Sequence, residues 1–218
     1  MKIFLQRYGI YLSTTTIHKY MNKDLNLSAI VMRKKPGYKS CKKHKIFDNL
    51  LKQKFNVDEK NKIWCTDFTY MRQPNGKFRY NCTIMDLFDR SAIASVNSDY
   101  INTELAIETL TEALKKEKPN NGILLHSDQR VQYTSWEFVN FCKDNGVIQS
   151  MSKAGCPYDN APMERFYNTF KNCFYYRYTF ESVEQLDEMT KQYINWYNYV
   201  RPHSTNNYMT PMEFRYRA

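Results

Sequence analysis

The sequence has 218 residues, a formal net charge of +10 and a hydrophobic fraction of 42%. This length suffices for one sizeable core with a smaller appended segment. No stretch approaches the roughly 20 apolar residues that a membrane-spanning helix needs, so we expect no membrane span. The six cysteines include no CxxC pair, which argues against a zinc site and favours the reduced thiols of a cytoplasmic protein over disulfides.

Positive charge is concentrated near the N-terminal end. Residues 1–62 contain 15 Lys and Arg against 4 Asp and Glu, whereas the remaining residues contain 17 against 18. The basic run at 33–45 includes Pro and Gly but no acidic residue, which is typical of a flexible linker. This asymmetry suggests a polyanion partner such as DNA or RNA, although a solvated basic face would give the same pattern. The candidate phosphate contacts in the run are Arg33, Lys34, Lys35, Lys42 and Lys43.

Two short helices are expected before this linker. The first covers residues 2–8 and stops at Gly9, and Ser13 can cap a second one that continues to about residue 22. Helix, glycine turn and helix is the outline of a helix-turn-helix, but a signal of this length is weak. After the linker, the pattern at 46–55 predicts another short helix.

From about residue 61 the pattern alternates between strands and helices. The order strand-strand-strand-helix-strand-helix-strand-helix is that of an RNase H-like α/β domain. We therefore predict a mixed five-stranded sheet flanked by helices at 61–218, preceded by a small basic helical segment at 1–60. The first three strands, the first two joined by an Asn-Gly turn, should form an antiparallel meander. Strands are expected at 62–72, 78–89, 91–98, 122–128 and 147–151, and helices at 103–117, 135–145, from 161 and at 183–200.

Three carboxylates are candidates for a shared site. Asp67 lies in the middle of an apolar and aromatic strand, where an unpaired buried carboxylate is costly. Asp128 ends a short buried strand, and strand ends in α/β sheets face ligand crevices. Glu164 lies in the first turn of a helix, where its only role could be a favourable interaction with the helix dipole. If the three side chains converge, they form an oxygen cluster suited to Mg²⁺ or Mn²⁺.

Four motifs follow one another in the core: "WCTDFTY", "LLHSDQRVQYTS", "SMSKAGCPYDNAPMERFYNTFK" and "YNYVRPHSTNNYMTPMEF". With them, the sequence resembles the integrase-core, DDE-type transposases of bacterial insertion sequences, the OrfB-like relatives of retroviral integrases. The 35 residues between Asp128 and Glu164 match the spacing of that family. The resemblance is strong over 63–214 and weak over the N-terminal segment.

The resemblance implies a DNA strand cleavage and strand transfer enzyme of DNA transposition. Asp67, Asp128 and Glu164 would be catalytic and would bind Mg²⁺ or Mn²⁺, with two ions expected. The enzyme would act on element ends and target DNA as a homo-oligomer, close to the nucleoid. The DNA contacts expected near the site are Lys171, Arg165, Tyr158 and Asn160.

The chain also departs from the family pattern. Arg130 and Val131 stand where relatives usually carry Gly and Ser, so a charged side chain lies beside Asp128. Because the chain starts partway through the region that precedes the core, a separately encoded helix-turn-helix protein is a possible partner. The alternative function is a truncated, catalytically silent remnant that only binds DNA.

Overall fold

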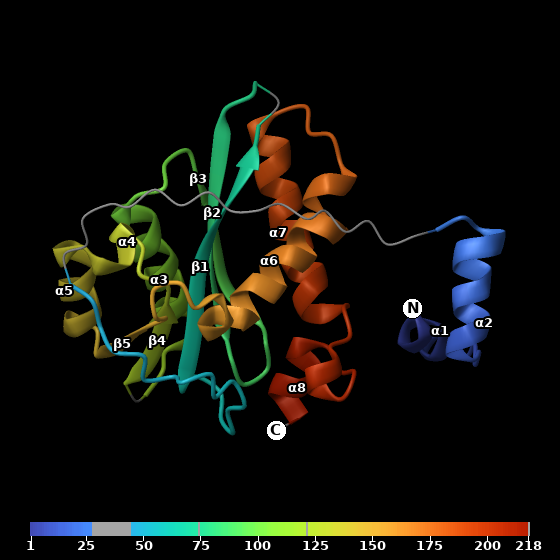
Figure 1. Cartoon of the computed structure of the whole chain (residues 1–218), viewed down its shortest axis with the longest axis horizontal. Coiled ribbons are helices and arrows are strands. Elements are labelled where there is room, and N and C mark those ends of the chain that lie inside the picture. The colour runs from blue at the N-terminus through green and yellow to red at the C-terminus, as the bar shows by residue number, and fades with distance from the viewer. Residues whose placement is uncertain (28–44, 74, 121, 218) are drawn as a thin grey trace.

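Five strands form one mixed sheet at the centre of the core (Figure 1). The computed structural model describes residues 1–27, 45–73, 75–120 and 122–217. The strand order is β3-β2-β1-β4-β5, so the predicted five-stranded α/β arrangement is confirmed. The strands are β1 (Ile63–Arg72), β2 (Phe78–Asp86), β3 (Ala92–Ser98), β4 (Ile123–Ser127) and β5 (Val147–Met151).

The pairing of β1 determines where the site lies. β1, β2 and β3 form the predicted antiparallel meander, whereas β4 is parallel to β1 and β5 is parallel to β4. The β1–β4 register ends with Cys65 opposite His126. Two residues further along each strand are Asp67 and Asp128, which this register places side by side. Beyond Cys65, no described strand pairs with this edge of β1.

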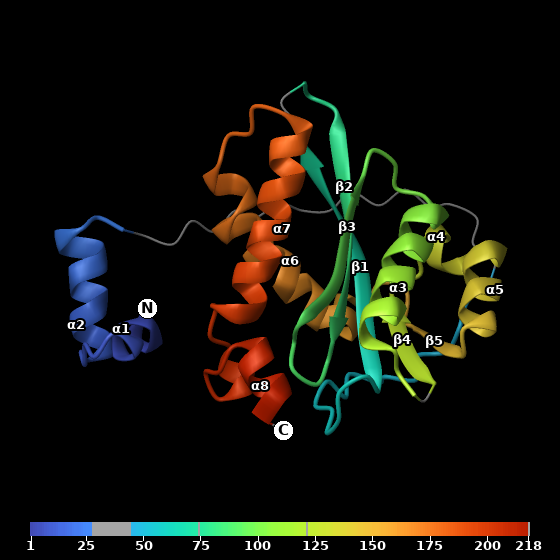
Figure 2. The same cartoon turned by 180° about the vertical axis from the view of Figure 1, so that it is seen from behind.

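Helices cover both faces of the sheet (Figures 1 and 2). One face carries α3, α4 and α5, and the other carries α6 and α7, which cross each other. The turn after α7 leads into the short α8, where the chain ends (Figure 1). The helices are α3 (Thr103–Glu117), α4 (Val131–Thr134), α5 (Trp136–Asp144), α6 (Ala161–Cys173), α7 (Val183–Tyr199) and α8 (Pro211–Arg217), with 3-10 turns at Pro157–Asn160, Tyr175–Arg177 and Ser204–Asn206.

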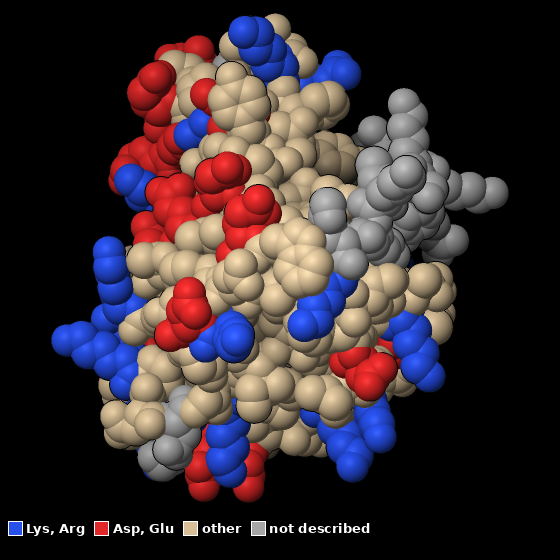
Figure 3. All heavy atoms as spheres, turned by 90° about the vertical axis from the view of Figure 1, so that its left-hand side faces the viewer, with Lys and Arg blue, Asp and Glu red and all other residues tan. Residues whose placement is uncertain are grey.

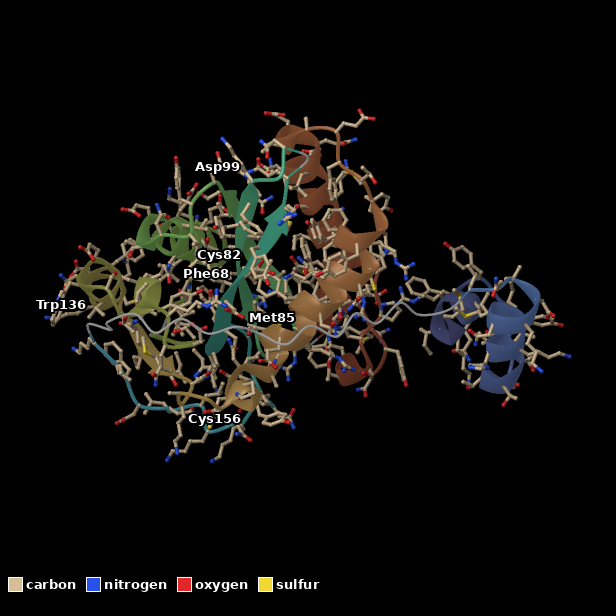
Figure 4. All side chains as sticks on the ribbon, turned by 45° about the horizontal axis from the view of Figure 1, so that its top comes forward. Phe68, Cys82, Met85, Asp99, Trp136 and Cys156 are labelled. Atoms are coloured by element: carbon tan, nitrogen blue, oxygen red, sulfur yellow. The ribbon has the colours of Figure 1, made fainter. Side chains whose placement is uncertain are left out.

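Each face of the sheet has its own apolar cluster. Phe68 and Cys82 belong to the cluster beneath α3 and α5, whereas Met85 belongs to the cluster beneath α6 and α7. Figure 4 shows the corresponding positions, with Met85 next to α6 and Trp136 on the outer helix α5. Alternation along each strand sends successive side chains to opposite clusters. Three aromatic side chains of α6 and of the residue directly after it are buried: Phe166, Phe170 and Phe174.

A buried arginine ties α8 to the core. Nη1 of Arg215 donates hydrogen bonds to Asp86, at 2.9 Å, and to Asp89. Its Nη2 donates to Glu117 and, at 3.0 Å, to Asn61. Burial, followed by the nearby charge of Asp89, raises the pKa of Asp86, and the Arg215 guanidinium opposes that rise. The network links the ends of β2 and α3 to the last helix.

The N-terminal segment contains the two predicted helices, α1 (Lys2–Arg7) and α2 (Thr14–Lys19), followed by a π-helical turn at Tyr20–Asp24. The hydroxyl oxygen of Ser13 caps α2 by accepting a hydrogen bond from the Thr16 N–H at 3.0 Å. Figures 1 and 2 show the pair apart from the sheet, and Arg7 makes an ion pair with Glu213 of α8 at 2.9 Å. The basic residues that we predicted to contact DNA lie outside the described residues: Arg33, Lys34, Lys35, Lys42 and Lys43.

The predicted helix at 46–55 is wrong. This stretch has no helix and runs along the core. Leu51 is buried in the cluster under α6, and the Leu50 N–H donates to the Ser150 hydroxyl at 2.9 Å. Contacts with the core, rather than helical hydrogen bonds, therefore stabilise this stretch. The division at residue 60 between the two segments remains a prediction.

The surface carries both charges. On the face shown in Figure 3, acidic side chains gather toward the upper left, while basic side chains are spread over the top, the left and the lower part. Among the described residues, no helix is both long and apolar enough to cross a membrane.

Candidate active site

Asp67 lies in β1, two residues beyond the last one that pairs with β4. Its side chain is 16% exposed, and its Oδ1 accepts a hydrogen bond from the Phe68 N–H at 2.7 Å. Burial raises the pKa of Asp67 to about 7, the Arg130 guanidinium opposes the rise, and the charges of Asp128 and Glu164 add to it. A carboxylate in such a position is unfavourable unless a positive charge lies close to it.

Asp128 follows the last residue of β4 and holds its loop. Its Oδ1 accepts the Arg130 N–H at 3.0 Å, and its Oδ2 accepts Nε of the same arginine at 2.9 Å. Nη2 of Arg130 lies 3.7 Å from Oδ1 of Asp67. The guanidinium therefore supplies the positive charge between the two aspartates. The sequence showed only that Arg130 departs from the family pattern and did not predict this role.

Glu164 projects from the first turn of α6. Its side chain is exposed, and burial raises its pKa. Its charge also adds to the raised pKa of Asp67. The register of β1 and β4 brings Asp67 and Asp128 together, whereas a shared site that includes Glu164 remains a prediction.

The loop before α6 is fixed by buried polar groups. Asp159 accepts hydrogen bonds from the Gln53 side-chain amide at 2.7 Å and from the Lys153 N–H at 2.9 Å. Asn160 donates through Nδ2 to the carbonyl of Thr66, directly before Asp67, at 3.1 Å. These bonds join the start of α6 to β1 and so fix the position of the helical turn that carries Glu164.

The donor chemistry of the site fits a divalent cation. Carboxylate oxygens are the ligands that Mg²⁺ and Mn²⁺ prefer, and neighbouring like charges need a compensating cation. The buried Oδ1 of Asn160 has no hydrogen-bond partner in the structure. As the side chains stand, however, no three His, Cys, Asp or Glu among the described residues are close enough to hold an ion. Holding one would require Arg130 to move aside and the carboxylates to close together.

The other predicted DNA contacts occupy different surroundings. Tyr158 and Arg165 are exposed, and Asn160 is buried against β1. Lys171 lies two turns beyond Glu164 on α6, with Nζ 4.3 Å from the centre of the Tyr70 ring. The alternation of β1 puts Tyr70 on the same face as the buried Phe68, so the sequence indicated neither the exposure of Tyr70 nor its contact with Lys171.

Comparison with known proteins identifies the family. Family models described as "Integrase core domain" match residues 57–157 and 145–211. An uncharacterized transposase-like protein of Haemophilus influenzae is 35% identical over 170 residues, which are 78% of this chain and 78% of that protein. The chain belongs to the integrase-core transposases of insertion sequences.

Other members of this transposase family are longer. The transposase for insertion sequence element IS904 of Lactococcus lactis is 35% identical over 76% of this chain and 66% of its own length. For the putative transposase InsK of IS150 from Escherichia coli, the identity is 33% over 77% of this chain and 59% of that protein. The chain thus spans about three fifths of the length of such relatives.

Solved structures support the fold. The HTLV-2 integrase catalytic core domain, solved with magnesium in a dimeric form, superposes with a TM-score of 0.58. That match covers 72% of this chain and 97% of the other at 16% identity, so it shows the RNase H-like fold alone. A chain of the simian T-cell lymphotropic virus intasome, in complex with PP2A regulatory subunit B56 gamma, gives a TM-score of 0.64 at 17% identity over 98% of this chain and 70% of that chain.

Proposed function

We propose that this protein cleaves DNA strands at the ends of an insertion sequence and transfers them to target DNA in a metal-dependent reaction. One observation supports the proposal: the parallel register of β1 and β4 leads to Asp67 and Asp128, and Arg130 lies within 3.7 Å of both carboxylates. Glu164, in the first turn of α6, would be the third carboxylate. The family relationship supports this activity, as do the transposase names of relatives.

Asp67, Asp128 and Glu164 would hold the cations, for which the proposal is two Mg²⁺ or Mn²⁺ ions. Two such ions would activate water or a DNA 3′-hydroxyl for in-line attack on a phosphodiester and stabilise the leaving oxygen. The protein would then need no covalent intermediate with DNA, and hence no Ser or Tyr nucleophile. Lys171, on the same side of α6 as Glu164, would hold a phosphate near the carboxylates.

The partners follow from the same proposal. The DNA would be the element ends and the target, and the basic residues before the core would add phosphate contacts. Two DNA ends must be brought together, so we propose a homo-oligomer on DNA, for which the dimeric and trimeric forms of the HTLV-2 core are a precedent. A separately encoded helix-turn-helix protein is the further proposed partner, and the nucleoid in the cytoplasm is the proposed location.

The test compares Glu164→Gln with wild type on labelled terminal-repeat DNA in Mg²⁺ or Mn²⁺. We expect cleavage and strand transfer to fall by orders of magnitude while DNA binding is retained, because only one anionic oxygen is lost. Glu137, also exposed in the first turn of a helix, provides a control: Glu137→Gln should leave cleavage unchanged.

Two results would count against the proposal. Equal cleavage by wild type and Glu164→Gln would reject the three-carboxylate site. Binding without cleavage by every variant, in the presence of the upstream helix-turn-helix protein, would favour the silent DNA-binding remnant.

A further inference from the structure

Two aromatic rings lie exposed on the sheet beyond the candidate active site. Tyr70 of β1 is 54% exposed, and Phe78 of β2 is 43% exposed. Their ring centroids are 5.6 Å apart, and the planes meet edge to face at 85°. Cross-strand contact between such rings stabilises a hairpin, but this contact does not explain why both rings leave so much of their surface exposed to solvent.

Two cations flank these rings. Nζ of Lys171 lies 4.3 Å from the centre of the Tyr70 ring, and Cζ of Arg72 lies 5.8 Å from that of Phe78. Arg72 is exposed, and its backbone is held by the Tyr175 hydroxyl, which accepts its N–H at 2.5 Å and donates to its carbonyl at 3.1 Å. Exposed aromatic rings with adjacent Lys and Arg are the combination that binds single-stranded nucleic acid, because bases stack on the rings and phosphates pair with the cations.

The position of the rings connects them with the carboxylates. Tyr70 is three residues beyond Asp67 on β1, or about 10 Å at the rise of an extended strand. Lys171 is seven residues beyond Glu164 on α6, again about 10 Å at the rise of a helix. β1 and α6 therefore lead from the carboxylates to the same place, where Lys171 contacts Tyr70. Successive side chains of β1 point to opposite faces, so a DNA strand would pass from Asp67 to Tyr70 around the edge of β1 with which no described strand pairs beyond Cys65.

We propose that Tyr70 and Phe78, flanked by Lys171 and Arg72, form a stacking surface for an unpaired base of the DNA strand that reaches the carboxylates. The proposal rests on the proposed function. A distance of about 10 Å corresponds to a few nucleotides, since stacked bases are about 3.4 Å apart along one strand. An end whose last base pairs are opened would then be held by one base on the rings while its phosphodiester reaches the site.

The test measures binding without catalysis, in EDTA, with the full chain. The probes are a duplex with a short unpaired 3′ tail containing 2-aminopurine and a fully paired duplex of the same length. For Tyr70→Ala we expect affinity for the tailed probe to fall by about fivefold or more, with loss of the stacking-induced fluorescence change, and affinity for the paired duplex to change by less than about twofold. Tyr70→Phe keeps the ring and should bind like wild type.

Tyr199 provides the matched control, because it is also 54% exposed but lies at the end of α7. Tyr199→Ala should bind both probes like wild type. The proposal is overturned if Tyr70→Ala binds the tailed probe as wild type does, or if it weakens both probes equally. Glu164→Gln should retain the fluorescence change, so a failure of the catalytic proposal leaves this measurement able to decide the stacking proposal.

Discussion

Replacing Arg130 with alanine should destabilise the metal-free protein and, at the same time, strengthen its binding of a divalent cation. In the structure, Nε of Arg130 lies 2.9 Å from Oδ2 of Asp128, and Nη2 of Arg130 lies 3.7 Å from Oδ1 of Asp67. The backbone at Arg130 is extended, with φ −66° and ψ 151°, which alanine adopts without strain. Alanine therefore removes the guanidinium without the added chain freedom that glycine would bring.

The magnitude follows from the two ion pairs. The pair with Asp128 is solvent-exposed on both sides and contributes about 0.5 kcal/mol. For Asp67, Coulomb's law at 3.7 Å gives about 1 kcal/mol in water and about 4 kcal/mol at an effective dielectric constant of 20. Arg130 is 41% exposed, so screening lowers the higher figure, and we take a total of about 2 kcal/mol.

Without metal, Arg130→Ala should therefore lower the free energy of unfolding by about 2 kcal/mol near pH 8. A cation that binds the two aspartates must displace Arg130, so the same variant should bind Mn²⁺ about thirtyfold more tightly. Denaturant unfolding in EDTA and calorimetric titration with Mn²⁺ measure the two effects, and Arg130→Lys, which keeps a charge, should show smaller changes in both. Mn²⁺ affinity that is unchanged or weaker in Arg130→Ala would refute the idea that this arginine occupies the place of a cation.

Three further predictions concern other parts of the chain. Arg215→Met should lower the free energy of unfolding by about 3–5 kcal/mol, as measured in urea, because three carboxylates would lose their buried cation. Burial, with Arg201 and Arg90 nearby, lowers the pKa of His203 to about 3. The stability that neutral His203 contributes is thus full above about pH 6.5 and declines as pH falls toward 3. Between pH 7.5 and 5, the free energy of unfolding of a His203→Asn variant should therefore fall by about 2 kcal/mol less than that of wild type, as measured by urea titrations at both pH values. Finally, DNA affinity of residues 1–62 should fall steeply with salt in a fluorescence titration, and an affinity independent of salt would exclude phosphate-dominated binding.

The strands of the core could be predicted because their local signals agree with their final environment. Residues 63–72 alternate between two buried clusters, and the Asn-Gly turn matches the hairpin that follows. The stretch at 46–55 failed for the opposite reason. Its apolar residues have helix-like spacing, but they contact the core individually, as Leu51 does, and the backbone is held by partners such as Ser150 that are distant in sequence.

The candidate site was predictable in its carboxylates but not in its charge balance. Asp67 could be singled out because an acidic residue within an apolar strand has no ordinary packing role. Arg130 looked only like a departure from relatives, since nothing in the sequence shows that its guanidinium lies beside Asp67 of β1. The loop turns after β4 because the Asp128 carboxylate accepts the Arg130 N–H, and this turn brings the guanidinium back beside Asp128.

That arrangement bears on why this member of the family can fold with such a site before metal binds. Two carboxylates at adjacent strand positions repel, and the cost is greatest for the one that is mostly buried, Asp67. A site with a small residue at position 130 would have to accept that repulsion, protonate one acid or recruit a cation. Here Arg130 contributes a cation from the chain itself, at the expense of competition when Mg²⁺ or Mn²⁺ arrives. Stability of the metal-free protein and affinity for metal should therefore change in opposite directions across substitutions at position 130, and the two measurements on Arg130→Ala and Arg130→Lys test that relation directly.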